Sequence, residues 1–397
     1  MKFRHHLPAV ALLALTGSAS AIKIEIRYDY DTNGFFTANP QAKTVLRAAA
    51  DFYEPLIKDS LGTINPAASG YTWSGKIEHP GTGTASFVVP GFVVPADTIV
   101  IFAGGRALGG AAGKGGYGGV SISGDSDWIT LVRCRGQTGA IASPATDFGP
   151  WGGYVSFDTG MSWNFSMTNP TASGVPFLSV ALHELGHALG IGTCPSWTAK
   201  VSGSNFTGAR AVQVYGGNVP LDTLSPGHWK DDKNGDPGVP SKAYGSFGSP
   251  HGLVQVGLMD PVVPSGSTNN LVVTDIDLAA LRDVGWQLDP PLNLTSPKPR
   301  PTGSPLVFSW PSTTGFTYRL QRSPSLAAGS WTDLSTQAGN GSTQQFSSAA
   351  SGLPKAFYRL TTEPAAAPAP LAAPVTFGPL STETPPGGVE GCMCGAH

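Results

Sequence analysis

Residues 183–190 read His-Glu-Leu-Gly-His-Ala-Leu-Gly, and this stretch decides both the fold and the chemistry that we expect. His183 and His187 are four positions apart, so on a helix they share one face and can bind one metal ion. Glu184 lies one step round the helix, beside the metal, where its carboxylate can accept a proton from water. Zn²⁺ suits two or three imidazoles with one open position. The spacing predicts a zinc site with Glu184 as general base; a surface helix with incidental histidines is the alternative.

The motif lies on a predicted amphipathic helix over residues 177–189. Its apolar stripe is formed by leucines at helical spacing, namely Leu178, Leu182, Leu185 and Leu189. Gly190 supplies the stop, because glycine readily adopts the left-handed conformation that ends many helices. The chain can then turn back soon after the second histidine, and a third metal ligand is expected from beyond the helix.

The pattern His-Glu-x-x-His-x-x-Gly resembles that of the metzincins, a family of zinc proteases. In their full motif a third histidine follows three positions after the glycine. Thr193 stands at that position and is a poor zinc ligand, so the resemblance to the short motif ends at Gly190. Either the site is incomplete or the third ligand lies further along the chain, where His228 and His251 are the candidates.

Two further segments resemble the leishmanolysin branch of the metzincins. That branch has a long insertion before its third histidine, which tryptophan follows, and later a Leu-Met turn that ends in proline. His228-Trp229 and the Gly-Leu-Met-Asp-Pro of residues 257–261 match this layout. The resemblance implies that His228 is the third zinc ligand, with His251 as runner-up, and that Met259 packs beneath the zinc in a Met-turn. From the residues alone, a loop histidine bonded to backbone and a plain core methionine are the alternatives.

The resemblance also implies the fold and the substrate class. It implies an α+β, metzincin-like catalytic domain over residues 22–288, with a mixed twisted sheet, the active-site helix and a C-terminal helix. Protein or peptide substrates would pair with an edge strand over residues 97–102. We interpret the Gly-rich stretch 104–119 as a flexible surface loop, because it lacks the Gly-Lys-Ser/Thr of a phosphate loop. This loop would border the cleft.

Periodicity and capping residues predict the other elements of this domain. Short apolar or alternating runs predict strands over residues 22–29, 87–94, 97–102 and 153–158. Asn39 followed by Pro40 begins a helix that we expect to reach residue 59. Thr274 and Asp277 have capping-box spacing, which predicts a last helix that ends at Gly285.

Both ends of the chain differ in composition from its middle. Residues 1–21 have a basic start, an apolar run and an Ala-Ser-Ala end, which predict a signal peptide and a secreted protein. No later apolar run is long enough to span a bilayer. We expect a Pro-rich linker over 289–305, a small all-β, sandwich-like domain over 306–363, and a disordered Ala/Pro-rich tail over 364–397 that ends in Cys392-Met393-Cys394.

The other cysteines and one acidic run offer further sites. Export permits disulfides, and Cys134 with Cys194 is the expected pair, with two free buried thiols as the alternative. Residues 231–236, Asp-Asp-Lys-Asn-Gly-Asp, place oxygens at alternate positions as Ca²⁺ loops do, but the glutamate that closes an EF-hand loop is missing. We interpret the run as a solvated acidic turn, with a Ca²⁺ site as the alternative.

The near-zero net charge excludes one class of protein. Lys and Arg number 24 and Asp and Glu 26, and the formal net charge of -2 excludes a polybasic nucleic-acid binder. The residues predict a secreted zinc-dependent endopeptidase. The alternative is an exported, non-proteolytic protein that binds cell-surface material through residues 292–363 and keeps a relic zinc site.

Overall fold

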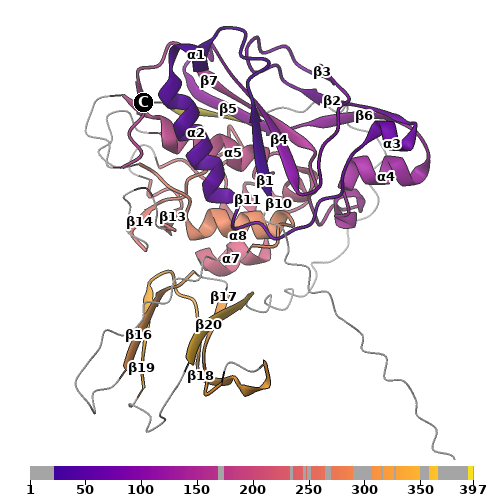
Figure 1. Ribbon diagram of the computed structural model, residues 1–397. Helices are drawn as coiled ribbons and strands as arrows, with labels where there is room; N and C mark the ends of the chain where they lie inside the picture. Colours follow the sequence, from indigo (N-terminus) through magenta and orange to yellow (C-terminus); the bar gives the residue numbers. More distant parts are fainter. Residues whose placement is uncertain are drawn as a thin grey trace, which may run out of the picture.

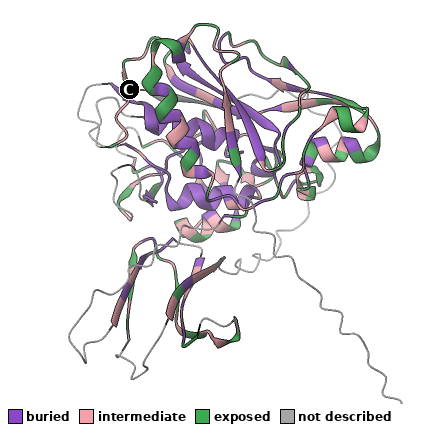
Figure 2. Ribbon diagram, viewed as in Figure 1, coloured by how far each residue is buried: buried purple, intermediate pink, exposed green. Residues whose placement is uncertain are grey.

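The computed structural model describes residues 22–168, 174–232, 236–244, 247, 252–263, 270–288, 306–313, 316–325, 328–348, 357–364 and 392–396. A mixed sheet runs through the larger part of the molecule, with helices packed against it (Figure 1). Buried residues concentrate in this sheet and in the helices beside it, whereas the outlying helices carry many exposed residues (Figure 2). The described part is thus the mixed α/β architecture that the sequence predicts.

The central sheet has the strand order β1-β4-β7-β5-β21-β15. The strands are β1 (Lys23–Arg27), β4 (Thr98–Arg106), β7 (Gly152–Asp158), β5 (Ala111–Tyr117), β21 (Cys392–Ala396) and β15 (Val262–Val263). β1, β4 and β7 are parallel, whereas β5 is antiparallel to β7. The prediction that residues 97–102 form an edge strand is wrong, because β4 is hydrogen-bonded on both sides. Its nearly continuous burial is typical of a central strand.

The Gly-rich stretch after β4 is not the loop that we expected. It forms β5 and then β6 (Gly119–Ser123), which joins β2 (Thr72–Ile77) and β3 (Phe87–Pro90) in a second sheet. Its glycines let helix α5 (Phe177–Ala188) pack directly on β5: a Cβ at Gly113 would lie 2.7 Å from Val180 Cγ1, and one at Gly115 would collide with the Glu184 carbonyl oxygen. Glycine is depleted in strands generally, so composition alone favours a loop.

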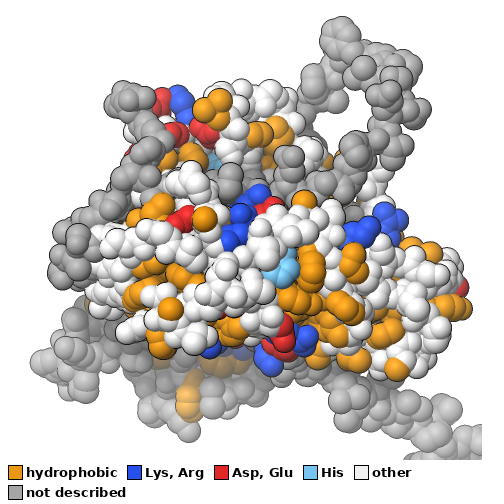
Figure 3. Space-filling view, turned by 90° about the horizontal axis from the view of Figure 1, so that it is seen from above, with side chains coloured by type: hydrophobic (Ala, Val, Ile, Leu, Met, Phe, Trp, Pro, Cys, Tyr) orange, Lys and Arg blue, Asp and Glu red, His pale blue; other side chains and the backbone are white. Residues whose placement is uncertain are grey.

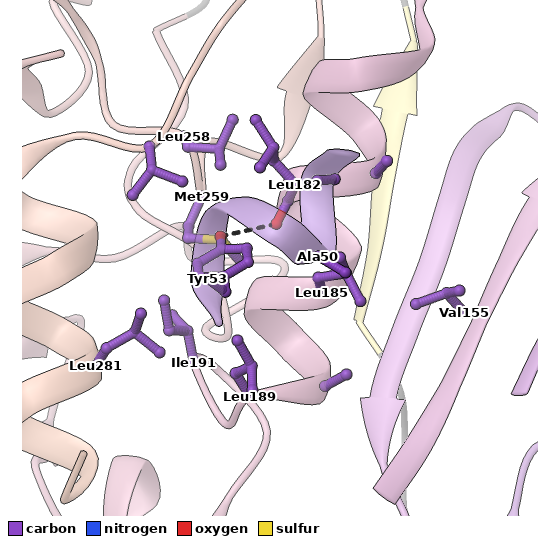
Figure 4. Close-up of a cluster of buried hydrophobic side chains, with 14 of the residues drawn as sticks. Ala50, Tyr53, Val155, Leu182, Leu185, Leu189, Ile191, Leu258, Met259 and Leu281 are labelled. Carbon is purple, nitrogen blue, oxygen red and sulfur yellow. Dashed lines mark hydrogen bonds between the residues drawn. The ribbon is translucent and has the colours of Figure 1, made fainter. Parts of the chain in front are cut away.

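Helix α5 is the core helix of the molecule, and every residue in it is buried. Helix α2 (Pro40–Tyr53) packs against it. The Tyr53 hydroxyl donates to the Leu182 carbonyl oxygen at 2.9 Å and joins the two helices (Figure 4). This packing fixes α5 between α2 on one side and the sheet on the other, so residues on α5 have little freedom to move.

Of the other two predicted helices, one ends where the sequence predicts and the other ends earlier. Helix α8 (Asp275–Val284) begins after Thr274 with the predicted capping box and ends at Gly285, so this prediction is confirmed. Helix α2 ends at Tyr53 rather than at residue 59. Pro55 follows, and its missing amide hydrogen cannot continue the helical ladder.

The other α-helices and strands up to residue 288 are short. They are α1 (Phe35–Ala38), α3 (Pro66–Ser69), α4 (Ser126–Cys134), β8 (Trp163–Asn164), β9 (Val175–Pro176), α6 (Pro195–Thr198), β10 (Val201–Ser202), β11 (Asn205–Phe206), α7 (Ala209–Tyr215), β12 (Val219–Pro220), β13 (Pro240–Lys242) and β14 (Val254–Val256). Between α5 and α8 the chain is mostly irregular, as its sequence predicts. It is nevertheless tied to the core through buried tryptophans such as Trp197 and Trp229.

Residues 306–364 form mainly strands where they are described. β16 (Leu306–Pro311) pairs with β19 (Thr343–Ser348), and β17 (Phe316–Ser323) lies between β18 (Thr332–Ala338) and β20 (Phe357–Pro364). Arg282 of α8 lies over the Phe316 ring, 3.7 Å from its centroid, and links this segment to the larger part. A separate sandwich-like domain here stays a prediction.

Several predicted features lie outside the described residues, namely the signal peptide over 1–21, the linker over 289–305, tail residues 365–391 and His251. Residues 392–396, which we expected to be disordered with the rest of the tail, form β21 because their backbone pairs with β5 and β15. Within the described part of the chain, no helix combines the length and the apolarity needed to cross a membrane.

Candidate metal centre

Helix α5 presents two histidines on one face, and a distant loop brings a third to them. The Nε2 atoms of His183 and His187 are 3.0 Å apart, and His228 Nε2 lies 3.2 Å from each of them. All three side chains are completely buried. The structure thus gathers His183, His187 and His228, whereas the other candidate, His251, lies outside the described residues.

The far ring nitrogens show which tautomer is present. His183 Nδ1 lies 2.8 Å from the Leu258 carbonyl oxygen, and His187 Nδ1 lies 2.8 Å from that of Ile191. A carbonyl oxygen can only accept a hydrogen bond, so each Nδ1 carries the proton when the ring is neutral. The Nε2 atoms of both rings therefore present lone pairs to the centre of the cluster.

Burial keeps these imidazoles neutral. It lowers the pKa of His183 to about 4 and holds the pKa values of His187 and His228 well below the ordinary value. Neutral nitrogens that point lone pairs at one another repel, and a shared cation removes that repulsion. Tetrahedral Zn²⁺, with bonds of about 2.0–2.1 Å, holds its nitrogen ligands about 3.3 Å apart. The donor set and its spacing therefore fit zinc.

The loop of the third histidine is tied to the predicted Met-turn. The Trp229 amide donates to the Met259 carbonyl oxygen at 2.9 Å, and the Trp229 indole donates to Asp277 Oδ1 at 2.8 Å. Asp277 Oδ2 also accepts from the Leu258 amide at 2.9 Å. One buried carboxylate on α8 thus holds the residue after His228 and the residue before Met259.

Sequence reasoning missed this role of Asp277 and assigned it only to the helix cap. Burial raises the pKa of its carboxyl, while hydrogen bonds from Trp229 and Thr274 oppose that rise. Its partners Leu258 and Trp229 are 19 and 48 positions away in the chain. No local pattern contains information about contacts at such separations.

Met259 packs against α5 at the level of the two histidines. It is fully buried, and a Cβ at Gly186 would lie 2.8 Å from its Sδ atom. The Asp260 amide donates to the Gly257 carbonyl oxygen at 3.0 Å and closes the turn. In Figure 4 the Met259 side chain lies beside Tyr53, which itself bonds to α5. The turn therefore packs directly against α5.

Glu184 lies between α5 and β5 and is completely buried. A Cβ at Gly113 would lie 2.5 Å from Glu184 Oε1, so the carboxylate fills space that only glycine leaves open. The Gly-rich sequence that we interpreted as a loop is therefore what makes room for the acid next to the histidines.

The turn after α5 explains why Thr193 is not at the centre. Gly190 has φ of 105°, a conformation that glycine adopts without strain, and the chain reverses there. The reversal places the Ile191 carbonyl oxygen on His187 Nδ1. The Thr193 hydroxyl donates to the His187 carbonyl oxygen at 2.7 Å, so this side chain caps the helix.

Cys134 and Cys194 are free, buried thiols, and the predicted disulfide is wrong. Cys134 Sγ donates to the Thr130 carbonyl oxygen on its own helix at 3.1 Å. Cys194 Sγ lies 3.1 Å from Ser196 Oγ at the start of α6. Each thiol is thus engaged locally, and burial raises the pKa of Cys194, which disfavours the reactive thiolate.

A group of acids lies where we considered a Ca²⁺ loop, but it is assembled differently. Carboxylate oxygens of Asp231, Asp232 and Asp260 lie within 4.8 Å of one another. Asp236, at the end of the acidic run, forms an ion pair with Lys230. The third acid of the group therefore comes from the Met-turn and not from the run itself.

The described residues on the face that is seen from above in the view of Figure 1 carry few charges. On the face shown in Figure 3, charged side chains form small groups of both signs, with apolar side chains scattered between them. This distribution agrees with a chain in which charged residues make up 13%. Recognition on this face cannot rest on a strong field of one sign.

Comparison with known proteins gives one match. Residues 131–199 match the family model described as Matrixin, a metzincin family. The matched stretch begins in α4, contains all of α5 and ends just after α6. The match and the His183–His187–His228 cluster support a zinc metallopeptidase. No curated protein and no solved structure matches the chain.

Proposed function

We propose that this protein is a secreted zinc endopeptidase of the metzincin type, with His183, His187 and His228 as its zinc ligands. The observation that carries the proposal is the convergence of three buried, neutral imidazoles at 3.0–3.2 Å. Three protein ligands leave one of the four zinc positions open, as catalysis requires. Zinc at this centre would polarise the scissile carbonyl and promote ionisation of water near neutral pH.

Glu184 is the general base in this proposal. It follows His183 directly on α5, and its buried position beside Gly113 keeps the carboxylate in one place. From there it accepts the proton of the attacking water and passes it to the leaving amine. Burial lowers the pKa values of His183, His187 and His228, so these imidazoles are neutral near pH 7. Glu184 is therefore the acid-base group of the centre in this proposal.

A leishmanolysin-like layout is supported by the link between Trp229 and Met259. In this layout tryptophan follows the third histidine and a Leu-Met turn comes later, and here Trp229 and Met259 share a backbone hydrogen bond of 2.9 Å. The basic start of residues 1–21 and their Ala-Ser-Ala end support export. Cell-surface contact through residues 306–363 is part of the same proposal and rests on the sequence alone.

We propose that an extended substrate peptide binds along β5. This strand packs on α5 at Glu184 and accepts a further strand on its outer side. Backbone hydrogen bonds to β5 would hold the peptide in register in front of the metal, and side-chain pockets would add specificity.

Removal of the metal is expected to abolish cleavage and to lower the melting temperature. A ligand present at 100 times its Kd stabilises the native state by about 2.7 kcal/mol. Casein cleavage, zinc content and thermal unfolding are measured on the full chain before treatment with 1,10-phenanthroline, after it, and after addition of Zn²⁺ or, as control, Mg²⁺. Zinc alone should restore both properties. Metal-replete protein that is inert toward casein and a broad peptide library would favour the non-proteolytic alternative.

A further inference from the structure

A second group of possible ligand atoms lies on the two segments that contain His228 and Met259. Asp231 and Asp232 follow shortly after His228, and Asp260 comes directly after Met259. Their carboxylate oxygens lie within 4.8 Å of one another. We propose that these three carboxylates form a Ca²⁺ site that fastens the His228 loop to the Met-turn.

Asp260 supplies the independent evidence for a ligand. The residue is 1% exposed, and its Oδ1 accepts from the Val262 amide at 2.9 Å. Its Oδ2 is buried and has no hydrogen-bond partner among the described residues. Burial, together with the charges of Asp232 and Asp231, raises the pKa of Asp260 to about 7. A buried carboxylate oxygen without a partner is costly, and a bound cation offsets that cost.

The chemistry of the group favours calcium. All its side-chain ligand atoms are oxygens. Hard cations such as Ca²⁺ and Mg²⁺ prefer oxygen ligands, whereas Zn²⁺ is bound mainly by nitrogen and sulfur. Ca²⁺ accepts six to eight oxygens at about 2.3–2.6 Å in flexible geometry, whereas Mg²⁺ demands a near-ideal octahedron. Asp232 is exposed and Asp231 is half-buried, so water can complete the coordination from the open side.

The position of the site gives it a consequence for zinc. The two segments that it joins are held by the bond from the Trp229 amide to the Met259 carbonyl oxygen. One segment carries His228, and the other carries Leu258, whose carbonyl oxygen orients His183. Bound Ca²⁺ would therefore hold two zinc ligands in place without contacting the zinc.

The test uses the full chain, stripped of calcium and kept saturated with zinc. Ca²⁺ is titrated by calorimetry, and the melting temperature is measured with and without it. Wild type should bind one Ca²⁺ and melt a few degrees higher with it. Asp260→Asn and Asp232→Asn should each weaken Ca²⁺ binding at least about tenfold, which is about 1.4 kcal/mol. Asp236→Asn, which alters the neighbouring ion pair with Lys230, is the matched control and should bind as wild type does.

A second readout separates a cation site from a purely structural role. Without Ca²⁺, Asp260→Asn should melt at the same temperature as wild type or higher, because it removes a buried like charge. The exposed Asp232→Asn keeps the test valid if the buried variant does not fold. Absence of saturable Ca²⁺ binding by wild type, or unchanged binding by Asp232→Asn, would overturn the proposal.

A different observation carries a second inference, which rests on the proposed peptidase function. Strand β21 pairs antiparallel with β5 over Cys392↔Gly115 to Gly395↔Ala111, and parallel with β15 at Val262↔Gly395 and Val263↔Ala396. It thus lies between the strand beside Glu184 and the strand that follows the Met-turn. Figure 4 shows it in yellow, running alongside α5. We infer that residues 392–396 occupy the substrate groove and inhibit the enzyme.

The backbone pairing explains how a short segment can compete. Both neighbours of β21 offer hydrogen-bonding edges, and an extended peptide in the groove would need the same edges. Because the segment is tethered, its effective concentration is on the order of millimolar, above the usual concentration of a substrate.

The experiment compares the full chain with a variant that ends at residue 391. The truncated variant should cleave a peptide substrate with a kcat/KM at least about tenfold higher, at unchanged zinc content. A synthetic peptide of residues 388–397 with serine in place of both cysteines should inhibit it competitively, and a scrambled peptide should not. Equal kcat/KM for the two chains, or no competition by the peptide, would refute the inference. If neither chain cleaves, saturable binding of the labelled peptide to the truncated chain alone still tests occupancy of the groove, separately from catalysis.

Discussion

Glu184→Gln is expected to abolish most peptide cleavage while the protein keeps its zinc. Glutamine has the size of glutamate and fits the space that Gly113 leaves open beside residue 184. Its amide, however, cannot accept the proton of the attacking water. General acid–base groups contribute roughly 10²–10⁴-fold to rates, or about 3–5 kcal/mol of barrier. We therefore expect kcat to fall by that factor with little change in zinc content or melting temperature.

The measurement is kcat and KM with a fluorogenic peptide, together with metal analysis of the same preparations. Glu25→Gln is the matched control, because Glu25 lies on β1 in partly exposed ion pairs with Lys23 and Arg27. Such pairs contribute little to stability. A Glu184→Gln enzyme with undiminished kcat would remove Glu184 from the mechanism, whereas a variant without zinc would give it a role in the metal site instead.

The helical parts of the fold could be predicted because their signals are local. The leucine stripe and Gly190 delimit α5, and the pair Thr274 and Asp277 marks the start of α8. Each signal depends on residues within about two helical turns of one another. The end of α2 had a local signal as well, since Pro55 is in the sequence, but the apolar repeat on either side obscured it.

The arrangement of the sheet could not be predicted in the same way. β5 consists mainly of alanine and glycine, and nothing in that composition says that a helix packs on it closely enough to exclude a Cβ. The placement of β4 in the middle of the sheet depends on β7, which is far along the chain. Pairing partners are a property of the whole topology, so a family resemblance misplaced the edge strand.

The site shows the same division. His183 and His187 belong to one motif, and the structure brings both imidazoles together on one face of α5. His228 was one of two candidates, and the fold brings it beside the pair, which its distance along the chain does not reveal. Asp277 was recognised as a cap, yet its carboxylate also holds Trp229 and the Met-turn. Ligands at helical spacing can be read from sequence, whereas the residues that orient them cannot.

His228→Ala should remove zinc from the protein, and His251→Ala should not. Loss of His228 leaves two imidazoles on α5, and zinc held by two protein ligands binds far more weakly than zinc held by three. Replacing one partner even in the second coordination shell costs about 10–100-fold in affinity, so a lost ligand should cost at least about 100-fold. Peptide cleavage should fall in parallel with the zinc content.

The comparison is made by metal analysis after dialysis against a zinc buffer, and by melting temperature with and without added Zn²⁺. Wild type and His251→Ala should gain stability with zinc, because the metal binds only the folded chain. His228→Ala should gain little, and His228→Cys, which restores a zinc ligand, should recover part of the gain. Circular dichroism checks that each variant is folded. If His251→Ala loses zinc while His228→Ala keeps it, the three nitrogens at 3.0–3.2 Å are not the metal site. In that case the assignment of His228 as the third zinc ligand is wrong.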